Sequence, residues 1–148
     1  MPRIYTSVEI DRPIEQVFDY VTTPANWPDW HTTALAVTGA TERSLEPGEA
    51  VTEDVKVMGR RSSATWTVLE RTPPTRWVIE GEIAAGAKAR ITYHLRANGA
   101  GTTFGREVVY TLPRALALLN GVLIKPRLEA EATASLQRLK TGLEGTPA

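Results

Sequence analysis

The sequence predicts an α+β domain in which a curved, seven-stranded antiparallel sheet wraps around one long C-terminal helix. Three observations support this fold class. The first residues alternate between polar and apolar side chains, which is typical of a strand buried on one face. Frequent turn-forming residues divide positions 34–112 into short strand-like segments. After Pro113, leucine and alanine recur every three to five residues, which is helical spacing.

The elements follow in order along the chain. Residues 3–10 form the first strand. A short helix is expected at about 13–21, because Pro13 suits a first helical position, and a second brief helical turn follows at 24–30. Short turns between the later segments imply antiparallel neighbours. The six remaining strands are expected at roughly 34–42, 49–58, 62–71, 76–84, 88–96 and 102–112.

The C-terminal part is expected to be helical for nearly thirty residues after Pro113. Pro126 lacks a backbone N–H, so the helix should kink or break there. The longest apolar stretch, 115–124, is too short to span a bilayer. With no signal-like segment at the N-terminus, we expect a soluble cytoplasmic protein.

Length and composition narrow the class of protein. A chain of 148 residues fits a single domain over residues 1–148. The 17 basic and 17 acidic residues cancel, which argues against nucleic-acid binding. The absence of cysteine removes disulfides and cysteine-ligated metal sites. No histidine and carboxylate spacing suits a metal, and no motif indicates a cofactor.

An antiparallel sheet of this length must curl, and one helix cannot fill its concave side, so a cavity is expected between sheet and helix. Strand parity identifies polar residues that should point into it. Glu53 shares the parity of Val51 and Val55, and Arg106 shares the parity of Phe104. A buried charge needs a partner, a hydrogen bond or water.

Glu53 and Arg106 are therefore expected to form the polar end of the cavity. Arg106 would orient a carboxylate, carbonyl or phenolate of a ligand. Two alternatives stay open: the pair only satisfies itself, or a bulge turns one side chain outward. The other candidate ligand-binding residues share the same predicted face or lie on the terminal helix: Val55, Trp66, Trp77, Ile79, Tyr93, Tyr110, Leu119 and Leu123.

Each aromatic ring in that set could equally be a plain core residue. Tyr93 and Tyr110 stand out because a buried phenol needs a hydrogen-bond partner. Of the two histidines, His94 falls on the outer face of its strand. His31 follows a helix-loop junction near the cavity rim, where a lone histidine is more often structural than catalytic.

Several segments resemble the START-like (SRPBCC) superfamily, which has the helix-grip fold and includes Bet v 1-like proteins and bacterial polyketide cyclase/dehydrase-type proteins. Residues 8–18 resemble the family's entry into its first helix, and the Asn-Trp-Pro-Asp-Trp sequence at 26–30 resembles the close of its second. Residues 73–77 and 99–103 match later turns. The resemblance implies an internal pocket; members include carriers of hydrophobic ligands, cyclases and hormone receptors.

Three functions remain open from the sequence. The leading hypothesis is binding of a small hydrophobic or aromatic ligand between sheet and helix. The second is a polyketide cyclase, aromatase or dehydratase, in which Glu53 moves a proton and Arg106 polarises a carbonyl. The third is an interaction module in which residues 116–124 dock a partner or a second copy. The oligomeric state stays open between a monomer and a homodimer.

Overall fold

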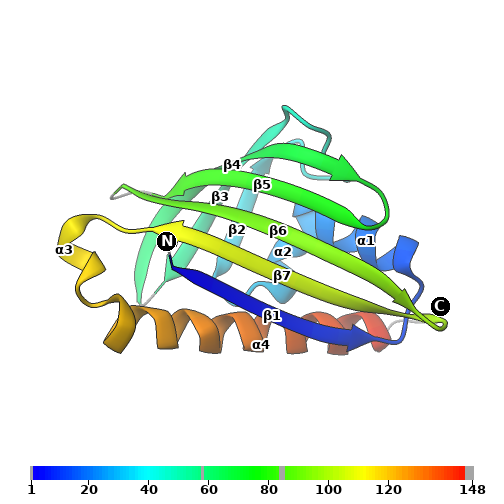
Figure 1. Ribbon diagram of the computed structural model, residues 1–148. Coiled ribbons are helices and arrows are strands. Elements are labelled where there is room, and N and C mark those ends of the chain that lie inside the picture. The colour runs from blue at the N-terminus through cyan, green and yellow to red at the C-terminus, as the bar shows by residue number, and fades with distance from the viewer. Residues whose placement is uncertain (1, 58, 84–85, 146–148) are drawn as a thin grey trace.

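The computed structural model describes residues 2–57, 59–83 and 86–145. Its strands are long and its first helices are short (Figure 1). In chain order, the elements are β1 (Arg3–Ile10), α1 (Ile14–Thr22), the 3-10 turn η1 (Pro24–Asn26), α2 (Trp27–Trp30), β2 (Ala34–Gly39), β3 (Ala50–Val57), β4 (Arg60–Thr72), β5 (Arg76–Ile83), β6 (Ala87–Asn98), β7 (Gly101–Thr111), α3 (Arg114–Ala117), the π-helical turn η2 (Asn120–Ile124) and α4 (Lys125–Glu144).

The seven strands form one antiparallel sheet in the order β1-β7-β6-β5-β4-β3-β2. Helices α1 and α2 carry the chain from β1 at one edge to β2 at the other, and every later strand pairs with its predecessor. Helix α4 runs beneath the sheet alongside β1 (Figure 1). The predicted α+β fold, with seven strands around a long C-terminal helix, is confirmed.

Two irregularities in strand pairing accompany the curvature of the sheet. The register between β4 and β5 shifts between Val68 and Glu70, and the register between β2 and β3 shifts between Ala34 and Ala36. Such bulges bend a strand and increase its local twist. The first lies toward the C-terminal end of β4 and the second at the start of β2. Both belong to the part of the sheet that folds over the helices (Figure 1).

The helical run after Pro113 is interrupted next to Pro126, where a kink or break was expected. Helix α3 ends at Ala117, η2 forms a wide turn, and α4 begins at Lys125. Pro126 lies in the first turn of α4, a position that tolerates its missing N–H. The expected break is confirmed, and it divides the run into α3, η2 and α4.

The large buried side chains gather at one end of the space between sheet and helices. Five aromatic rings pack there with centroid separations of 5.1 to 6.2 Å, a spacing typical of favourable aromatic contacts. Leu136, Leu139 and Leu143 cover them from α4. This aromatic cluster consists of Trp27, Trp30, Trp77, Tyr93 and Phe104.

Among the helices that the structure describes, none has the length and apolar character needed to cross a membrane.

Candidate functional site

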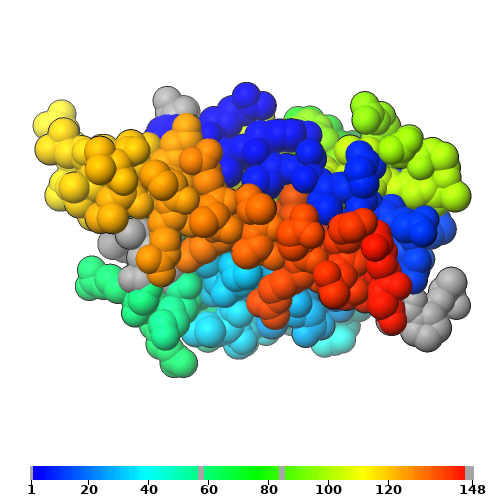
Figure 2. Space-filling model, turned by 90° about the horizontal axis from the view of Figure 1, so that it is seen from below, coloured from blue at the N-terminus to red at the C-terminus, as the bar shows by residue number. Residues whose placement is uncertain are grey.

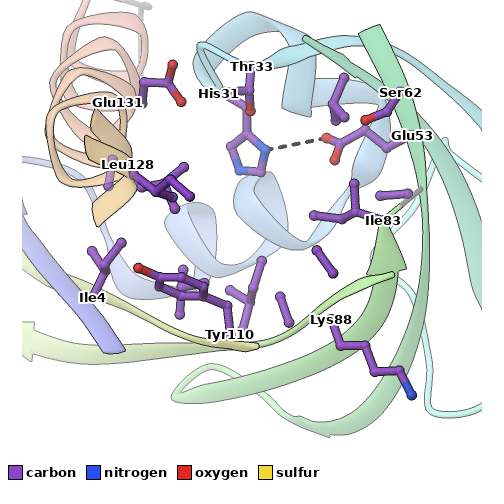
Figure 3. Close-up of a pocket in the computed structure, with 18 of the residues that line it drawn as sticks. Ile4, His31, Thr33, Glu53, Ser62, Ile83, Lys88, Tyr110, Leu128 and Glu131 are labelled. Carbon is purple, nitrogen blue, oxygen red and sulfur yellow. Dashed lines mark ion pairs between the residues drawn. The ribbon is translucent and has the colours of Figure 1, made fainter. Parts of the chain in front are cut away.

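A cavity of about 620 Å³ occupies the other end of the space between sheet and helix (Figure 3). Its size falls within the range of pockets that hold small organic ligands. The side chains in its wall include several small ones, at Ala64, Ala89, Ala132 and Ser135. Because these side chains do not reach across to one another, the interior stays open where the aromatic cluster ends.

Most of the candidate residues from the sequence lie in the cavity wall. Those that line the cavity are Glu53, Val55, Trp66, Ile79, Arg106, Tyr110, Leu119 and Leu123. That these residues bind a ligand stays a prediction. Their shared location follows from strand parity, which placed them on the concave face of the sheet.

Trp77 and Tyr93 lie outside the cavity lining, contrary to the expected wall. Both are fully buried in the aromatic cluster. The indole N–H of Trp77 donates to the backbone carbonyl of Leu45 at 3.1 Å, which satisfies its polar atom within the core. Parity assigned both residues to the correct face, but it does not say how far along the strand the cavity ends.

Glu53 lies on β3 at the inner end of the cavity and is 4% exposed. Its Oε1 accepts a hydrogen bond of 3.1 Å from the indole N–H of Trp66 on the adjacent strand β4. Its Oε2 lies 3.5 Å from Nδ1 of His31 (Figure 3). That distance is within ion-pair range, but Oε2 has no partner with hydrogen-bond geometry among the described residues.

His31 is held in place from three directions. It is the C-cap residue that follows α2, and its backbone N–H donates to the carbonyl of Trp27 at 2.8 Å. Its ring stacks on Trp27 at 5.7 Å and meets the edge of Trp30 at 3.9 Å. The next residue, Thr32, donates its backbone N–H to Oγ of Ser135 on α4 at 3.0 Å. The imidazole therefore points from the helical layer toward the sheet.

Burial lowers the pKa of His31; Glu53 opposes this, and the nearby Arg106 charge adds to it. The ring is consequently neutral at neutral pH and carries one N–H. Because the carboxylate of Glu53 can only accept, the Nδ1–H tautomer fits the contact between them. Nε2 is then an acceptor that faces the hydroxyl of Tyr93 at 3.5 Å.

Arg106 reaches the same region from β7, where its Cα pairs with that of Tyr93. Its Nε is buried and has no hydrogen-bond partner within the described part of the chain. Burial raises the pKa of Tyr93, and the Arg106 charge opposes that rise. Glu53 contacts His31 and Trp66, and no ion pair joins Glu53 to Arg106 among the described residues. The two predicted charges thus share the cavity without neutralising each other directly.

The outer end of the cavity is formed by Tyr110 and by the segment that follows β7. The phenol of Tyr110 donates to Oδ1 of Asn120 at 2.5 Å, which ties the sheet to η2. Burial raises the pKa of this phenol. Leu119 and Leu123 belong to the cavity lining. Lys88 also lines the cavity, and the end of its side chain extends away from the cavity centre (Figure 3).

Sequence reasoning missed two ionisable residues in the wall. His31 was expected at the rim of the cavity and lies at its inner end. Its position directly after two tryptophans that pack in the core could have indicated that it is buried. Glu131 on α4 faces the cavity from the opposite side (Figure 3), and burial raises its pKa. Its helix spacing from Leu128 and Ser135, both in the wall, could have revealed it. His94 is exposed on the outer face, as predicted.

No group of three or more potential metal-ligating side chains occurs in the residues that the structure covers.

Residues 1–144 match the family model described as polyketide cyclase / dehydrase and lipid transport. The chain belongs to this family. The match confirms the resemblance to polyketide cyclase/dehydrase-type proteins of the START-like superfamily. The match extends from β1 through the last residue of α4, so it includes every helix and strand of the fold.

Individual relatives are distant. Toxin Rv0910 of Mycobacterium tuberculosis strain H37Rv is 22% identical over 145 residues, which is 98% of this chain and 100% of that protein. The structure of a conserved protein from Geobacillus kaustophilus has a TM-score of 0.78 at 12% identity, covering 97% of this chain and 96% of its own.

A second solved structure covers a larger protein than this chain. DynU16, from the dynemicin biosynthetic locus, has a TM-score of 0.70 at 17% identity. The alignment covers 98% of this chain but only 48% of DynU16, so this chain spans about half the length of that protein. At these identities, the structural likeness establishes the fold.

Proposed function

We propose that the protein binds a small hydrophobic molecule in the cavity, with an oxygen-bearing end group at Arg106 and Glu53. The observation that carries this proposal is the pairing of a mostly apolar cavity with unsatisfied polar atoms at its inner end. Arg106 Nε and Glu53 Oε2 are buried without hydrogen bonds to described residues. Buried polar atoms are normally satisfied, and a ligand would supply the missing partners.

The two polar atoms have complementary chemistry. A guanidinium N–H can only donate, so Arg106 suits a carboxylate, carbonyl or phenolate oxygen. A carboxylate oxygen can only accept, so Glu53 suits a hydroxyl group. The ring of Trp66 and the side chain of Ile79 supply part of the apolar wall of the cavity. The preferred ligand is therefore an elongated or flat apolar molecule with oxygen groups at one end.

The family description supports this ligand class. Lipid transport and polyketide cyclisation or dehydration both involve hydrophobic molecules with carbonyl, carboxyl or hydroxyl groups. The shared property is recognition of an apolar body with a polar end, which is the arrangement of side chains in this cavity.

Fluorescence titration with cis-parinaric acid, a fatty acid whose carboxylate can meet Arg106, tests the proposal. We expect saturable binding that weakens at least ~tenfold in Arg106→Met, since hydrogen bonds to charged groups contribute about 1.5–3 kcal/mol. Arg90→Met is the matched control, because Arg90 lies exposed on β6 and pairs with Glu80 at 2.8 Å. Absence of saturable binding, or equal affinity in Arg106→Met, would contradict the proposal.

A second candidate function is proton-transfer catalysis of the cyclase or dehydratase kind. The observation favouring it is the contact between His31 and Glu53 in the cavity wall. A carboxylate positioned by a neighbouring imidazole can act as a general base, and Oε2 of Glu53 has no hydrogen-bond partner among the described residues. Glu53 would remove a proton from the carbon beside a carbonyl, with His31 as the positioning residue, and Arg106 would stabilise the negative charge that develops on the carbonyl oxygen.

Deuterium exchange of 2-tetralone in heavy water, followed by NMR, tests this second function. The protein should accelerate exchange at the carbon beside the carbonyl, and His31→Gln and Glu53→Gln should each lose that acceleration. His94→Gln, on the outer face, should retain it. A wild-type protein that leaves the exchange rate unchanged would contradict catalysis and leave the binding proposal standing.

A further inference from the structure

The segment between β7 and α4 exposes apolar side chains in two directions. It is called the mouth segment below and comprises residues 114–124. Leu116, Leu119 and Leu123 line the cavity but are still exposed to solvent. Leu118 and Val122 are 88% and 87% exposed. Among the described residues, eight large hydrophobic side chains are exposed, and five of them belong to this segment.

Such a cluster is unusual on the surface of a protein. Single exposed apolar residues are common, but a contiguous apolar patch marks an interaction site. A helical segment that is apolar around its circumference is normally buried against protein or lipid. Here the segment protrudes from one end of the molecule, away from the C-terminus (Figures 1 and 2). Nothing in the described chain covers Leu118 or Val122.

The charges around the mouth are predominantly basic. Residues 111–128 contain Arg114, Lys125 and Arg127 and no acidic residue. Across the opening, Arg60 and Arg61 belong to a stretch, residues 55–69, that also lacks acidic residues. Two nearby cations have acidic partners: Lys88 contacts Glu82 at 3.2 Å, and Arg127 lies 3.8 Å from Glu131. Exposed apolar side chains are thus bracketed by positive charge on both sides of the cavity opening.

These observations discriminate between possible occupants. A second copy docked through the same patch would place basic residues of one copy against those of the other, since a symmetric dimer interface pairs identical surfaces. A bilayer that contains anionic lipids has the matching chemistry: its acyl region accepts leucine and valine side chains, and its phosphates attract lysine and arginine.

We propose that the mouth segment docks on the surface of an anionic lipid bilayer, with Leu118 and Val122 inserted into the headgroup and acyl boundary. Arg60, Arg61 and Arg114 would then meet lipid phosphates around the opening. In this pose the cavity opens toward the membrane, so an apolar ligand moves between bilayer and cavity without crossing water. The inference extends the proposed function but depends on different residues.

Vesicle co-sedimentation tests the proposal. The wild-type protein should pellet with phosphatidylcholine vesicles that contain about 30% phosphatidylglycerol, and much less with phosphatidylcholine alone. The double substitution Leu118→Glu and Val122→Glu should lower the partition coefficient at least tenfold. Arg60→Ser with Arg61→Ser should weaken binding at about 50 mM salt, and about 500 mM salt should weaken wild-type binding by screening.

Leu69→Glu is the matched control, because Leu69 is an exposed leucine on β4 outside the mouth segment. It should bind vesicles like the wild type, and circular dichroism should show all variants folded. The proposal is overturned if the wild type does not pellet with the anionic vesicles, or if Leu69→Glu loses as much binding as the double variant.

Sedimentation equilibrium supplies the alternative outcome. A wild-type dimer that the Leu118→Glu and Val122→Glu substitutions dissociate would overturn membrane docking in favour of self-association. Arg106→Met separates this inference from ligand binding: it should lose affinity for cis-parinaric acid and keep its affinity for vesicles. Failure of one proposal is therefore distinguishable from failure of the other.

Discussion

Nδ1 of His31 lies 3.5 Å from Oε2 of Glu53, although the two residues come from opposite layers of the molecule. His31 directly follows the short helix α2, and Glu53 lies in the middle of β3. Both are nearly inaccessible to solvent. A buried polar contact of this kind is sensitive to protonation and to the loss of either partner, and this sensitivity yields the first prediction.

Acid should destabilise the protein through His31. Burial lowers the pKa of His31 in the folded state, so the unfolded chain binds its proton more readily. The stability that this residue contributes is full above the unfolded-state pKa, near 6.5, and is lost as the pH falls below that value. Glu53, Tyr93 and Arg106 face the imidazole. Burial is the main cause of the lowered pKa of His31; Glu53 raises this pKa and Arg106 lowers it.

Urea unfolding between pH 5 and pH 8 measures this dependence, whose slope is at most about 1.4 kcal/mol per pH unit for one proton. His31→Gln should flatten the profile in the acid range. His94→Gln is the control, because it removes an exposed histidine and should leave the pH dependence of stability unchanged. Parallel profiles for the wild type and His31→Gln would refute the assignment.

The hydrogen bond from Trp66 to Glu53 should couple the two side chains energetically. Trp66→Phe leaves Oε1 of Glu53 buried without its donor, which costs about 1–3 kcal/mol of unfolding free energy. Glu53→Leu removes the acceptor instead. The double variant should be less destabilised than the sum of the single variants by about 1 kcal/mol or more. Additive effects in urea unfolding would show that the bond contributes nothing.

Gly81 should not tolerate a side chain. It pairs with Trp66 across β4 and β5, and an added Cβ would lie 2.3 Å from the carbonyl oxygen of Thr65 and 2.6 Å from the Trp66 ring. Gly81→Ala should therefore destabilise the protein by about 1–3 kcal/mol and change the tryptophan fluorescence.

Gly142→Ala is the matched control for this substitution. Gly142 lies in α4 with nothing within 4 Å of an added Cβ, and alanine favours a helix over glycine by up to about 1 kcal/mol. Thermal unfolding should show a loss of stability in Gly81→Ala and none in Gly142→Ala. Equal stability of the two variants would mean that the β5 strand can move away from Trp66.

A larger side chain in the cavity should weaken ligand binding without lowering the free energy of unfolding. Ala132 is buried on α4 and lines the cavity, so Ala132→Leu places three more carbon atoms in open space. We expect affinity for cis-parinaric acid to fall at least ~tenfold, while unfolding free energy stays unchanged or rises by about 1 kcal/mol. Ala134→Leu, on the exposed face of the same helix, should alter neither quantity. Unchanged affinity in Ala132→Leu would place the ligand elsewhere.

The strand pattern carried most of the information about the fold. Alternation and turn residues located all seven strands to within a few residues, because antiparallel neighbours with short links leave few topologies. Parity also placed Glu53 and Arg106 in one cavity. These properties depend on local sequence, which a single chain displays directly.

Contacts between residues that are distant in sequence were harder to predict from the sequence. The meeting of His31 with Glu53 depends on how α2 docks between α4 and the sheet, through contacts such as Thr32 with Ser135. No local pattern encodes that docking. Trp77 was predicted to line the cavity, because its parity places it on the concave face of the sheet. In the structure, neighbouring aromatic rings fill the space around it, so it is a core residue. The boundary between core and cavity is set by side-chain volumes from several elements together.

The position of β1 at the sheet edge beside β7 has a consequence for folding kinetics. Its pairing partner lies about a hundred residues away in sequence, as in the contact between Ile4 and Val108. Helix α4, which supplies one wall of the cavity, follows all seven strands in the chain. Folding rates fall as contacts become more distant in sequence. During synthesis, the concave face of the nascent sheet therefore stays uncovered until α4 has been made.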